Sequence, residues 1–198
     1  QMCIRDRDNT MKLSLSYEVK PFKINQQWGV SNPSVYSRFG FTEHNGTDVA
    51  LGNDSLVYAP AKGTIIKSSN HPTGGGIFIG FLLDDLYTFD DGVTCHVLVD
   101  YLHLEKVIAL VGTSYEVGSV LAKADNTGFS TGPHTHIQYR RGEWNGNVFI
   151  QRDRNEANNS FDPTPFYNGY FAKDSELVVN ILGKIIETLT KMIASFKK

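Results

Sequence analysis

Residues 128–137, GFSTGPHTHI, are the stretch from which the fold and the site are most directly inferred. A glycine-bounded turn leads straight into a predicted strand that carries His134 and His136. On a strand, side chains two residues apart point to the same face. The stretch therefore predicts two imidazoles side by side, with Thr135 and Ile137 facing the other way. Two imidazoles on one strand face indicate a metal site or an acid/base pair.

A tight upstream segment, residues 44–48 (HNGTD), offers further metal ligands. A hydrolytic zinc site needs about three ligands from His, Asp or Glu and an open position for water. Gly46 is expected to allow the sharp backbone path that turns His44 and Asp48 toward one point. One carboxylate and two neutral imidazoles would leave the site positively charged, which lowers the pKa of a bound water. The residues alone do not decide between His134 and His136 as the remaining ligand.

His103 lies at the end of a predicted strand over 94–104. Strand alternation places it on the face of Tyr101, with His96 on the other face. Beside a metal, an imidazole at this position would donate or accept a proton. His71, in a glycine-rich loop, is interpreted as a solvated residue, and His96 as a structural or exposed one.

Short apolar segments separated by turn residues recur along the chain, and few of them show helical spacing. Such a pattern predicts a mainly β fold built from an antiparallel sheet, in the manner of a β-sandwich. Strands are predicted within 44–51, which begins as a turn, and over 56–59, 63–68, 77–83 and 94–104. Further short strands are predicted within 115–123, and a last one follows the glycine-bounded turn and runs to about residue 140. The prolines of Asp162-Pro163-Thr164-Pro165 are expected to end the domain, because proline cannot continue a strand.

Composition sets broad limits on the partners. The chain has 198 residues, 40% of them hydrophobic, which suits one domain with an appendage. The formal net charge of -2 argues against a nucleic-acid partner. The two cysteines, Cys3 and Cys95, define no disulfide framework. The basic residues Arg140 and Arg141 are expected to be solvated, and contact with an anionic wall polymer is the alternative.

The sequence divides into a leader (1–16), a domain (17–170) and a C-terminal segment (174–198). Residues 1–10, QMCIRDRDNT, look non-native or disordered, and Met11 is a candidate natural start. The polar start has no apolar core of a secretory signal, so none is predicted and the export route is left open.

The C-terminal segment predicts an amphipathic, basic α-helix. Four lysines against one glutamate give residues 184–198 a net charge of +3. We considered two roles for this helix, packing on its own domain or on a second copy, and contact with a membrane surface through residues 177–198. Its apolar residues are 177, 178, 181, 182, 185, 186, 189, 192, 193 and 196.

Three motifs occur in the order His-x-Gly-x-Asp (44–48), Tyr-x-His-Leu (101–104) and Gly-x-Ser-Thr-Gly-Pro-His-x-His (128–136). Together they resemble the lysostaphin-type (LytM-like) zinc metalloendopeptidases, which act on peptidoglycan. The resemblance covers about residues 36–167. It implies a β-rich zinc peptidase domain with a narrow groove over the metal.

By position, the resemblance implies that His44, Asp48 and His136 bind Zn²⁺. It implies that His103 and His134 are catalytic histidines that lie near the metal without binding it. Thr135 departs from the family pattern, which usually has leucine between the two histidines. Thr135 is expected to face away from the metal.

The implied activity is zinc-dependent hydrolysis of peptide bonds in bacterial peptidoglycan, in a cross-bridge or a stem peptide, at the cell wall outside the cytoplasm. The setting suggested by the polar start and the basic helix is a phage-type lysin. We considered two other functions, a catalytically silent wall-binding or regulatory module and a virion structural component. The bond cleaved and the oligomeric state are not predicted.

Overall fold

Strand β8 (Thr94–Val107) is the longest strand of the computed structural model, which describes residues 11–17, 23–51, 55–152 and 159–171. Its sequence, TCHVLVDYLHLEKV, is rich in β-branched and aromatic residues that favour an extended backbone. Val97, Val99 and Tyr101 are fully buried on one face. The other strands are β1 (Leu13–Leu15), β2 (Lys23–Gln26), β3 (Thr47–Ala50), β4 (Leu56–Tyr58), β5 (Gly63–His71), β6 (Gly76–Leu83), β7 (Tyr87–Thr88), β9 (Ser114–Tyr115), β10 (Val120–Ala124), β11 (Thr135–Trp144), β12 (Phe149–Gln151) and β13 (Tyr167–Phe171).

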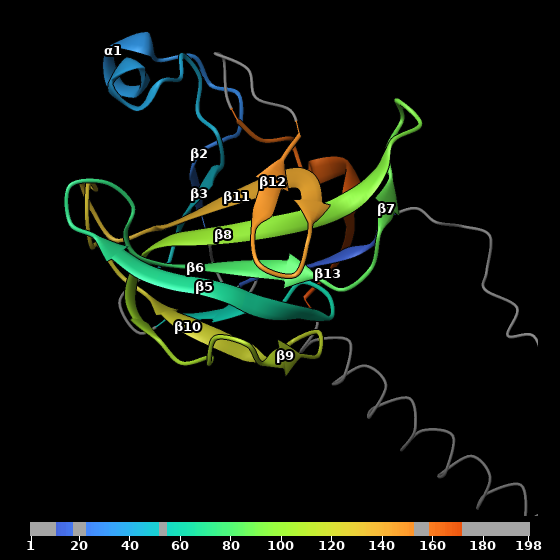
Figure 1. Cartoon of the computed structure of the whole chain (residues 1–198). Coiled ribbons are helices and arrows are strands. Elements are labelled where there is room, and N and C mark those ends of the chain that lie inside the picture. The colour runs from blue at the N-terminus through green and yellow to red at the C-terminus, as the bar shows by residue number, and fades with distance from the viewer. Residues whose placement is uncertain (1–10, 18–22, 52–54, 153–158, 172–198) are drawn as a thin grey trace, which may run out of the picture.

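The main sheet is antiparallel and has the strand order β2-β3-β11-β8-β6-β5-β9. Figure 1 shows β11, β8, β6 and β5 side by side, with β10 and β9 below them. Three short helical turns in the described residues join this framework: α1 (Pro33–Tyr36), η1 (Ser37–Phe39) and η2 (Thr164–Phe166). The mainly β, antiparallel fold expected from the sequence is confirmed.

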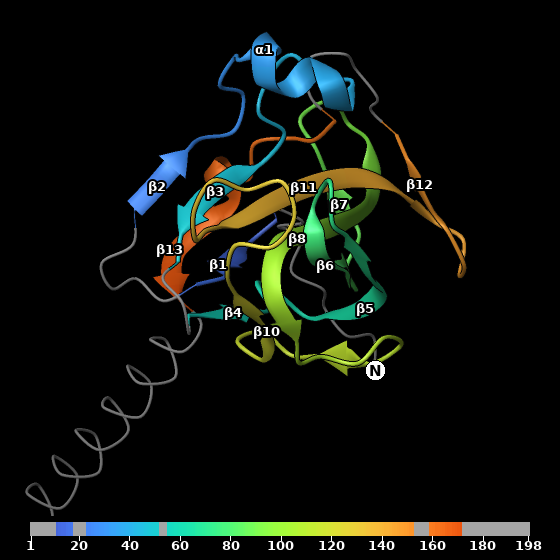
Figure 2. The ribbon, with the colours of Figure 1, turned by 90° about the vertical axis from the view of Figure 1, so that its left-hand side faces the viewer.

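The core lies between the main sheet and a layer formed by β4, β10 and β1. β10 pairs with both β4 and β8, so the chain folds back under the sheet, as Figure 2 shows from the side. Val57 of β4 and Leu121 of β10 are fully buried and belong to the same hydrophobic core as Tyr101 and Tyr139 of the main sheet. The opposite face of the sheet is open where it carries the candidate site.

β1 lies within the segment that the sequence assigns to a leader. It pairs in parallel with β13, and Leu13 is fully buried. The side chain of Ser16 is hydrogen-bonded to the Tyr101 hydroxyl (2.7 Å). Residues 11–16 therefore pack on the domain, and the two-stranded parallel sheet that they form departs from the antiparallel expectation.

The C-terminal segment 174–198 and the leader residues 1–10 lie outside the described residues. The predicted amphipathic helix and its roles therefore stay predictions. None of the helices in the described part of the chain has the length and apolarity that a membrane crossing requires.

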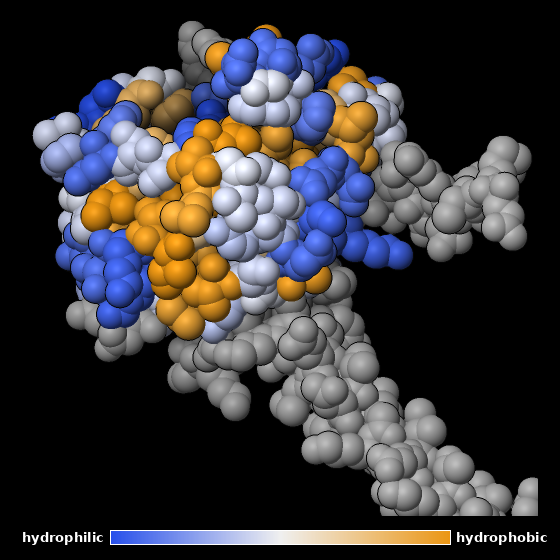
Figure 3. All heavy atoms as spheres, turned by 60° about the horizontal axis from the view of Figure 1, so that its bottom comes forward, coloured by the Kyte–Doolittle hydropathy of each residue, from blue (hydrophilic) through white to orange (hydrophobic). Residues whose placement is uncertain are grey.

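An apolar surface lies on the face at the bottom of Figure 1, where Figure 3 shows hydrophobic side chains gathered together. β9 and its flanking turns belong to this side of the molecule. Four exposed apolar residues of these turns are Ile108, Leu110, Val111 and Val117, which are 45–69% exposed.

Candidate metal centre

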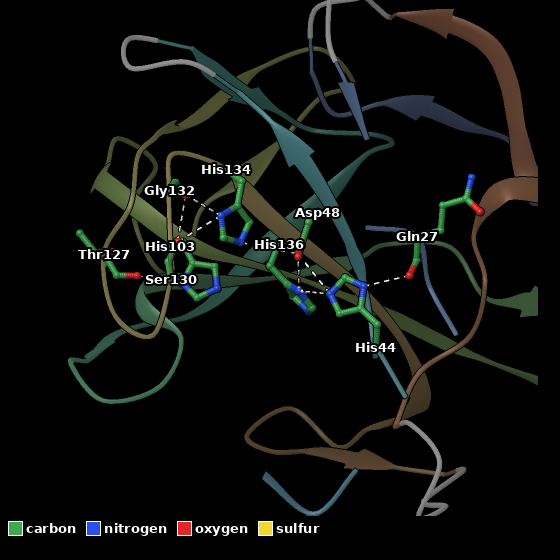
Figure 4. Close-up of polar contacts among 9 residues, drawn as sticks. All are labelled: Gln27, His44, Asp48, His103, Thr127, Ser130, Gly132, His134 and His136. Carbon is green, nitrogen blue, oxygen red and sulfur yellow. Dashed lines mark hydrogen bonds and ion pairs between the residues drawn. The ribbon is translucent and has the colours of Figure 1, made fainter. Parts of the chain in front are cut away.

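His44, Asp48 and His136 come together at one point, as their motifs predict. Asp48 in β3 and His136 in β11 are directly opposite each other in the strand register. The Nδ1 atom of His136 lies 2.9 Å from Asp48 Oδ1 and 3.0 Å from His44 Nε2 (Figure 4). His44 Nε2 is 3.2 Å from the same carboxylate oxygen. Three ligand atoms of the kind that bind metal ions therefore converge.

A backbone carbonyl sets the tautomer of His44. Its Nδ1–H donates a hydrogen bond to the carbonyl oxygen of Gln27 (2.9 Å), which leaves Nε2 as a lone-pair acceptor facing Asp48. Two acceptors at this separation repel each other unless a proton or a cation lies between them. The donor set therefore fits a metal ion, and one carboxylate with two imidazoles is a set that zinc accepts.

Gly46 is required for a reason other than the expected one. Its backbone is not among those with a positive φ. Instead, an added Cβ would lie 2.4 Å from His136 Nε2 and 2.7 Å from the Ile137 carbonyl oxygen. The missing side chain lets the imidazole pack directly on the backbone between His44 and Asp48.

The electrostatics keep Asp48 ionised. Burial alone would raise the pKa of its carboxyl, but the hydrogen bond from His136 Nδ1, together with the adjacent His44 ring, outweighs burial and holds the pKa well below its usual value. Burial lowers the pKa of His136, against the opposing effect of Asp48. At neutral pH the centre therefore combines a carboxylate with a neutral imidazole, the forms that bind metal.

His134 and His103 lie beside this centre. The Nδ1–H of His134 donates to the Gly132 carbonyl oxygen (2.8 Å), and its Nε2 is 3.7 Å from Asp48 Oδ1. The Nδ1–H of His103 donates to the Thr127 carbonyl oxygen (2.8 Å). The two rings are 4.8 Å apart between centroids (Figure 4). Both imidazoles thus keep Nε2 unprotonated in the neutral form.

The backbone of His103 breaks the strand alternation. Among the described non-glycine residues, His103 alone has a positive φ (63°). Tyr101 is buried in the core, whereas His103 lines the cavity together with Leu102. The expectation that His103 shares a face with Tyr101 is therefore wrong, because the left-handed residue turns its side chain toward the metal centre.

The five histidine and aspartate side chains line a cavity of about 380 Å³. One wall comes from α1 and η1, where Tyr36 stacks on His44 with ring centroids 5.5 Å apart. The other wall includes Gly75 and Phe129. Phe129 meets Phe39 of the first wall edge-on (5.5 Å between centroids), so aromatic rings border the cavity. The narrow groove expected from the resemblance matches this arrangement.

The groups that orient the histidines lie outside the three motifs. These groups are the carbonyls of Gln27 and Thr127 and the aromatic wall at Tyr36 and Phe39. His71 is exposed, in line with the solvated residue expected from the sequence, and its ring meets that of Phe78. His96 lines a separate cavity, and the thiol of Cys95 is buried.

A model of peptidase family M23 matches residues 42–149, which is more than half of the chain. The chain belongs to peptidase family M23. The match includes all five side chains of the centre.

Two curated M23 relatives have stated activities. Peptidoglycan DD-endopeptidase ShyA of Vibrio cholerae is 27% identical over 130 residues, which is 63% of this chain and 28% of ShyA. Glycyl-glycine endopeptidase ALE-1 of Staphylococcus capitis is 28% identical over 123 residues, which is 62% of this chain and 28% of ALE-1. The chain thus spans less than a third of the length of these relatives.

The fold matches a solved M23 structure. The catalytic domain of lysostaphin from Staphylococcus simulans superposes with a TM-score of 0.53 and 26% identity, over 73% of this chain and 91% of that domain. The resemblance to lysostaphin-type peptidases expected from the motifs is confirmed.

Proposed function

We propose that this chain is a zinc-dependent endopeptidase that hydrolyses peptide bonds of bacterial peptidoglycan. The observation that carries the proposal is the convergence of His44, Asp48 and His136 in one cavity with His103 and His134, within an M23 domain. A silent binding module would not need this set of five side chains.

His44, Asp48 and His136 are the proposed Zn²⁺ ligands. When bound, zinc supplies a Lewis acid for the scissile carbonyl and lowers the pKa of a coordinated water. The hydrogen bond from His44 to Gln27 holds the ring in the orientation in which Nε2 faces Asp48. His136 Nδ1 faces Asp48, so to offer this atom to a cation the neutral ring would carry its proton on Nε2.

His103 and His134 are the proposed catalytic histidines. Burial lowers the pKa of His103 to about 4, so its ring is neutral at pH 7. Both rings donate through Nδ1 to backbone carbonyls, which leaves both Nε2 atoms able to accept a proton from water and return it to the leaving amine. The proximity of the two rings lets them share this task and, once protonated, stabilise a developing oxyanion.

The substrate is proposed from the relatives. The names of the relatives describe cleavage of a DD bond of peptidoglycan by ShyA and of a glycyl-glycine bond by ALE-1. The site of action would be the cell wall outside the cytoplasm, and a phage-type lysin is the proposed setting.

Digestion of purified sacculi tests the proposal, with mass spectrometry of the released fragments. The full chain is expected to release peptides of one bond type, to stop with a chelator and to recover when Zn²⁺ is added. His44→Ala should abolish both zinc binding and release, whereas His71→Ala, which changes an exposed histidine, should retain both. His134→Ala should bind zinc without releasing fragments. Sacculi that bind the protein but stay intact would support a wall-binding module instead.

A further inference from the structure

A second cavity lies at the other end of the open face of the main sheet. Its volume is about 460 Å³. β5, β6 and β8 form its floor, and the turn between β11 and β12 forms a wall. In Figure 1 this end of β8 lies beside β7, away from α1, which borders the metal centre. Residues that line the cavity include Thr64, Leu82, Asp84, His96, Trp144 and Asn147.

The strand register places this cavity on the same face as the metal centre. His136 of β11 is opposite Leu102 of β8, and Gly142 is opposite His96. Both intervals are six residues, an even number, so the side chains at their two ends point to one face. At about 3.3 Å per residue, the two sites are roughly 20 Å apart along the sheet.

Ion pairs occupy the sheet surface between the two sites. Asp100, which is 4% exposed, pairs with Lys67 (2.9 Å) and with Arg140. Lys67 reaches Asp100 across Gly80, where an added Cβ would meet the lysine side chain at 2.4 Å. Arg140 is therefore not the solvated residue expected from the sequence. Among the described residues, β11, β8, β6 and β5 are consecutive neighbours in one sheet, and this sheet carries both sites.

The chemistry of the second cavity suits a sugar. Trp144 offers a partly exposed, rigid aromatic face that is polar at its edge. Its backbone N–H donates to His96 Nδ1 (3.3 Å), which leaves Nε2–H of the neutral ring as a donor. Asp84 and Asn147 are exposed and add a carboxylate and an amide. An apolar face with several hydrogen-bonding groups matches a neutral ring that carries hydroxyl and amide groups.

We propose that this cavity binds a saccharide of N-acetylated amino sugars, the glycan to which the cleaved peptide is attached. The inference rests on the proposed function, because it names a second part of the same substrate. An extended peptide of four or five residues spans about 14–17 Å. A peptide of that length, with the link to its sugar, bridges the distance between the two sites.

Fluorescence offers a direct test, because Trp28 and Trp144 are the two tryptophans of the chain. Trp28→Phe leaves Trp144 as the sole indole. Titration of the chelator-treated full chain with a peptide-free oligomer of N-acetylglucosamine is expected to change its emission in a saturable way. Asp84→Ala combined with Asn147→Ala should weaken this binding about tenfold or more, equivalent to about 1.4 kcal/mol. The titration needs neither metal nor catalysis, so failure of the proposed function would not affect it.

Calorimetry of the otherwise unchanged chain provides a second measurement, which does not depend on Trp28→Phe. Trp144→Ala should remove the saccharide binding and lower the ratio of sacculus cleavage to cleavage of a sugar-free peptide. Unchanged emission and an unchanged ratio would overturn the proposal. The proposal would also be overturned if deletion of 174–198 changed the emission while addition of the saccharide did not, because the cavity would then hold that segment.

Discussion

Gly46 is the residue at which space is most restricted in the centre. Gly46→Ala would place a Cβ 2.4 Å from His136 Nε2, with backbone on its other side. We expect His136 to be displaced and zinc affinity to fall by at least about tenfold, in the range seen when groups that orient ligands are lost. Competition titration with a chromophoric chelator would measure this.

Gly132→Ala is the matched control for Gly46→Ala. Its Cβ would meet no atom within 4 Å, although Gly132 also lies at the centre. Zinc affinity should be retained in this variant. Equal affinity in both variants would show that His136 is not a ligand or that its ring has room to move.

The buried ring of His103 makes the stability of the metal-free protein depend on pH. Burial lowers its pKa to about 4, against about 6.5 in the unfolded chain. Between these values the unfolded state binds the extra proton, so stability is present above about pH 6.5 and falls as pH decreases toward 4. One proton contributes at most about 1.4 kcal/mol per pH unit.

His103→Asn should flatten this dependence. Asparagine does not titrate here and tolerates the left-handed backbone of residue 103. Denaturant unfolding of chelator-treated protein between pH 4.5 and 7 would compare the slopes. His71→Asn, at an exposed histidine, should keep the wild-type slope. A variant slope as steep as that of the wild type would mean that His103 is not protonated on unfolding.

At the residue scale, the sequence predicts which side chains meet but not what orients them. The spacing of His44 and Asp48, and the pair His134 and His136, is local, so motifs reveal it. The Thr127 carbonyl that holds His103 depends on strand pairing far along the chain. The left-handed backbone of His103 leaves no sequence signal either, because non-glycine residues of any type adopt it uncommonly.

At the scale of elements, β1 tests where the domain begins. Leu13 is fully buried, and its strand covers one end of the core. Leu13→Ala should lower the free energy of unfolding by about 2–5 kcal/mol, as for other buried leucines. Lys12→Ala, at an exposed neighbour, should cost less than about 0.5 kcal/mol. A small effect of Leu13→Ala would show that residues 11–16 behave as a leader after all.

The strands themselves are largely predictable, whereas their partners are not. β8 and β6 follow from alternating or continuous apolar residues, which are visible locally. β1 has only three residues, and its partner β13 lies at the other end of the described chain. A short strand of this kind is stabilised by packing against the core and not by the propensities of its own residues. Neither its existence nor its parallel direction can therefore be inferred from those residues.

At the scale of the whole molecule, the C-terminal segment offers a test of membrane contact. Residues 184–198 carry a net charge of +3 beside apolar residues with helical spacing. A surface-binding helix gains from both the apolar burial and the attraction to anionic lipid. The full chain is therefore expected to sediment with anionic vesicles, less in high salt and little with neutral ones, and deletion of 174–198 should abolish sedimentation.

The same deletion also tests the alternative role of the C-terminal segment, packing on its own domain. The domain exposes apolar side chains that a helix of the same chain could cover. Leu110 and Val117, beside β9, are 69% and 49% exposed. If the segment packs there, its deletion should lower the free energy of unfolding and increase association in light scattering, with no change in vesicle binding. Leu110→Asp should then have the effect of the deletion, and combining the two should add little, since both remove one contact. If the segment binds membrane instead, Leu110→Asp should leave vesicle binding intact.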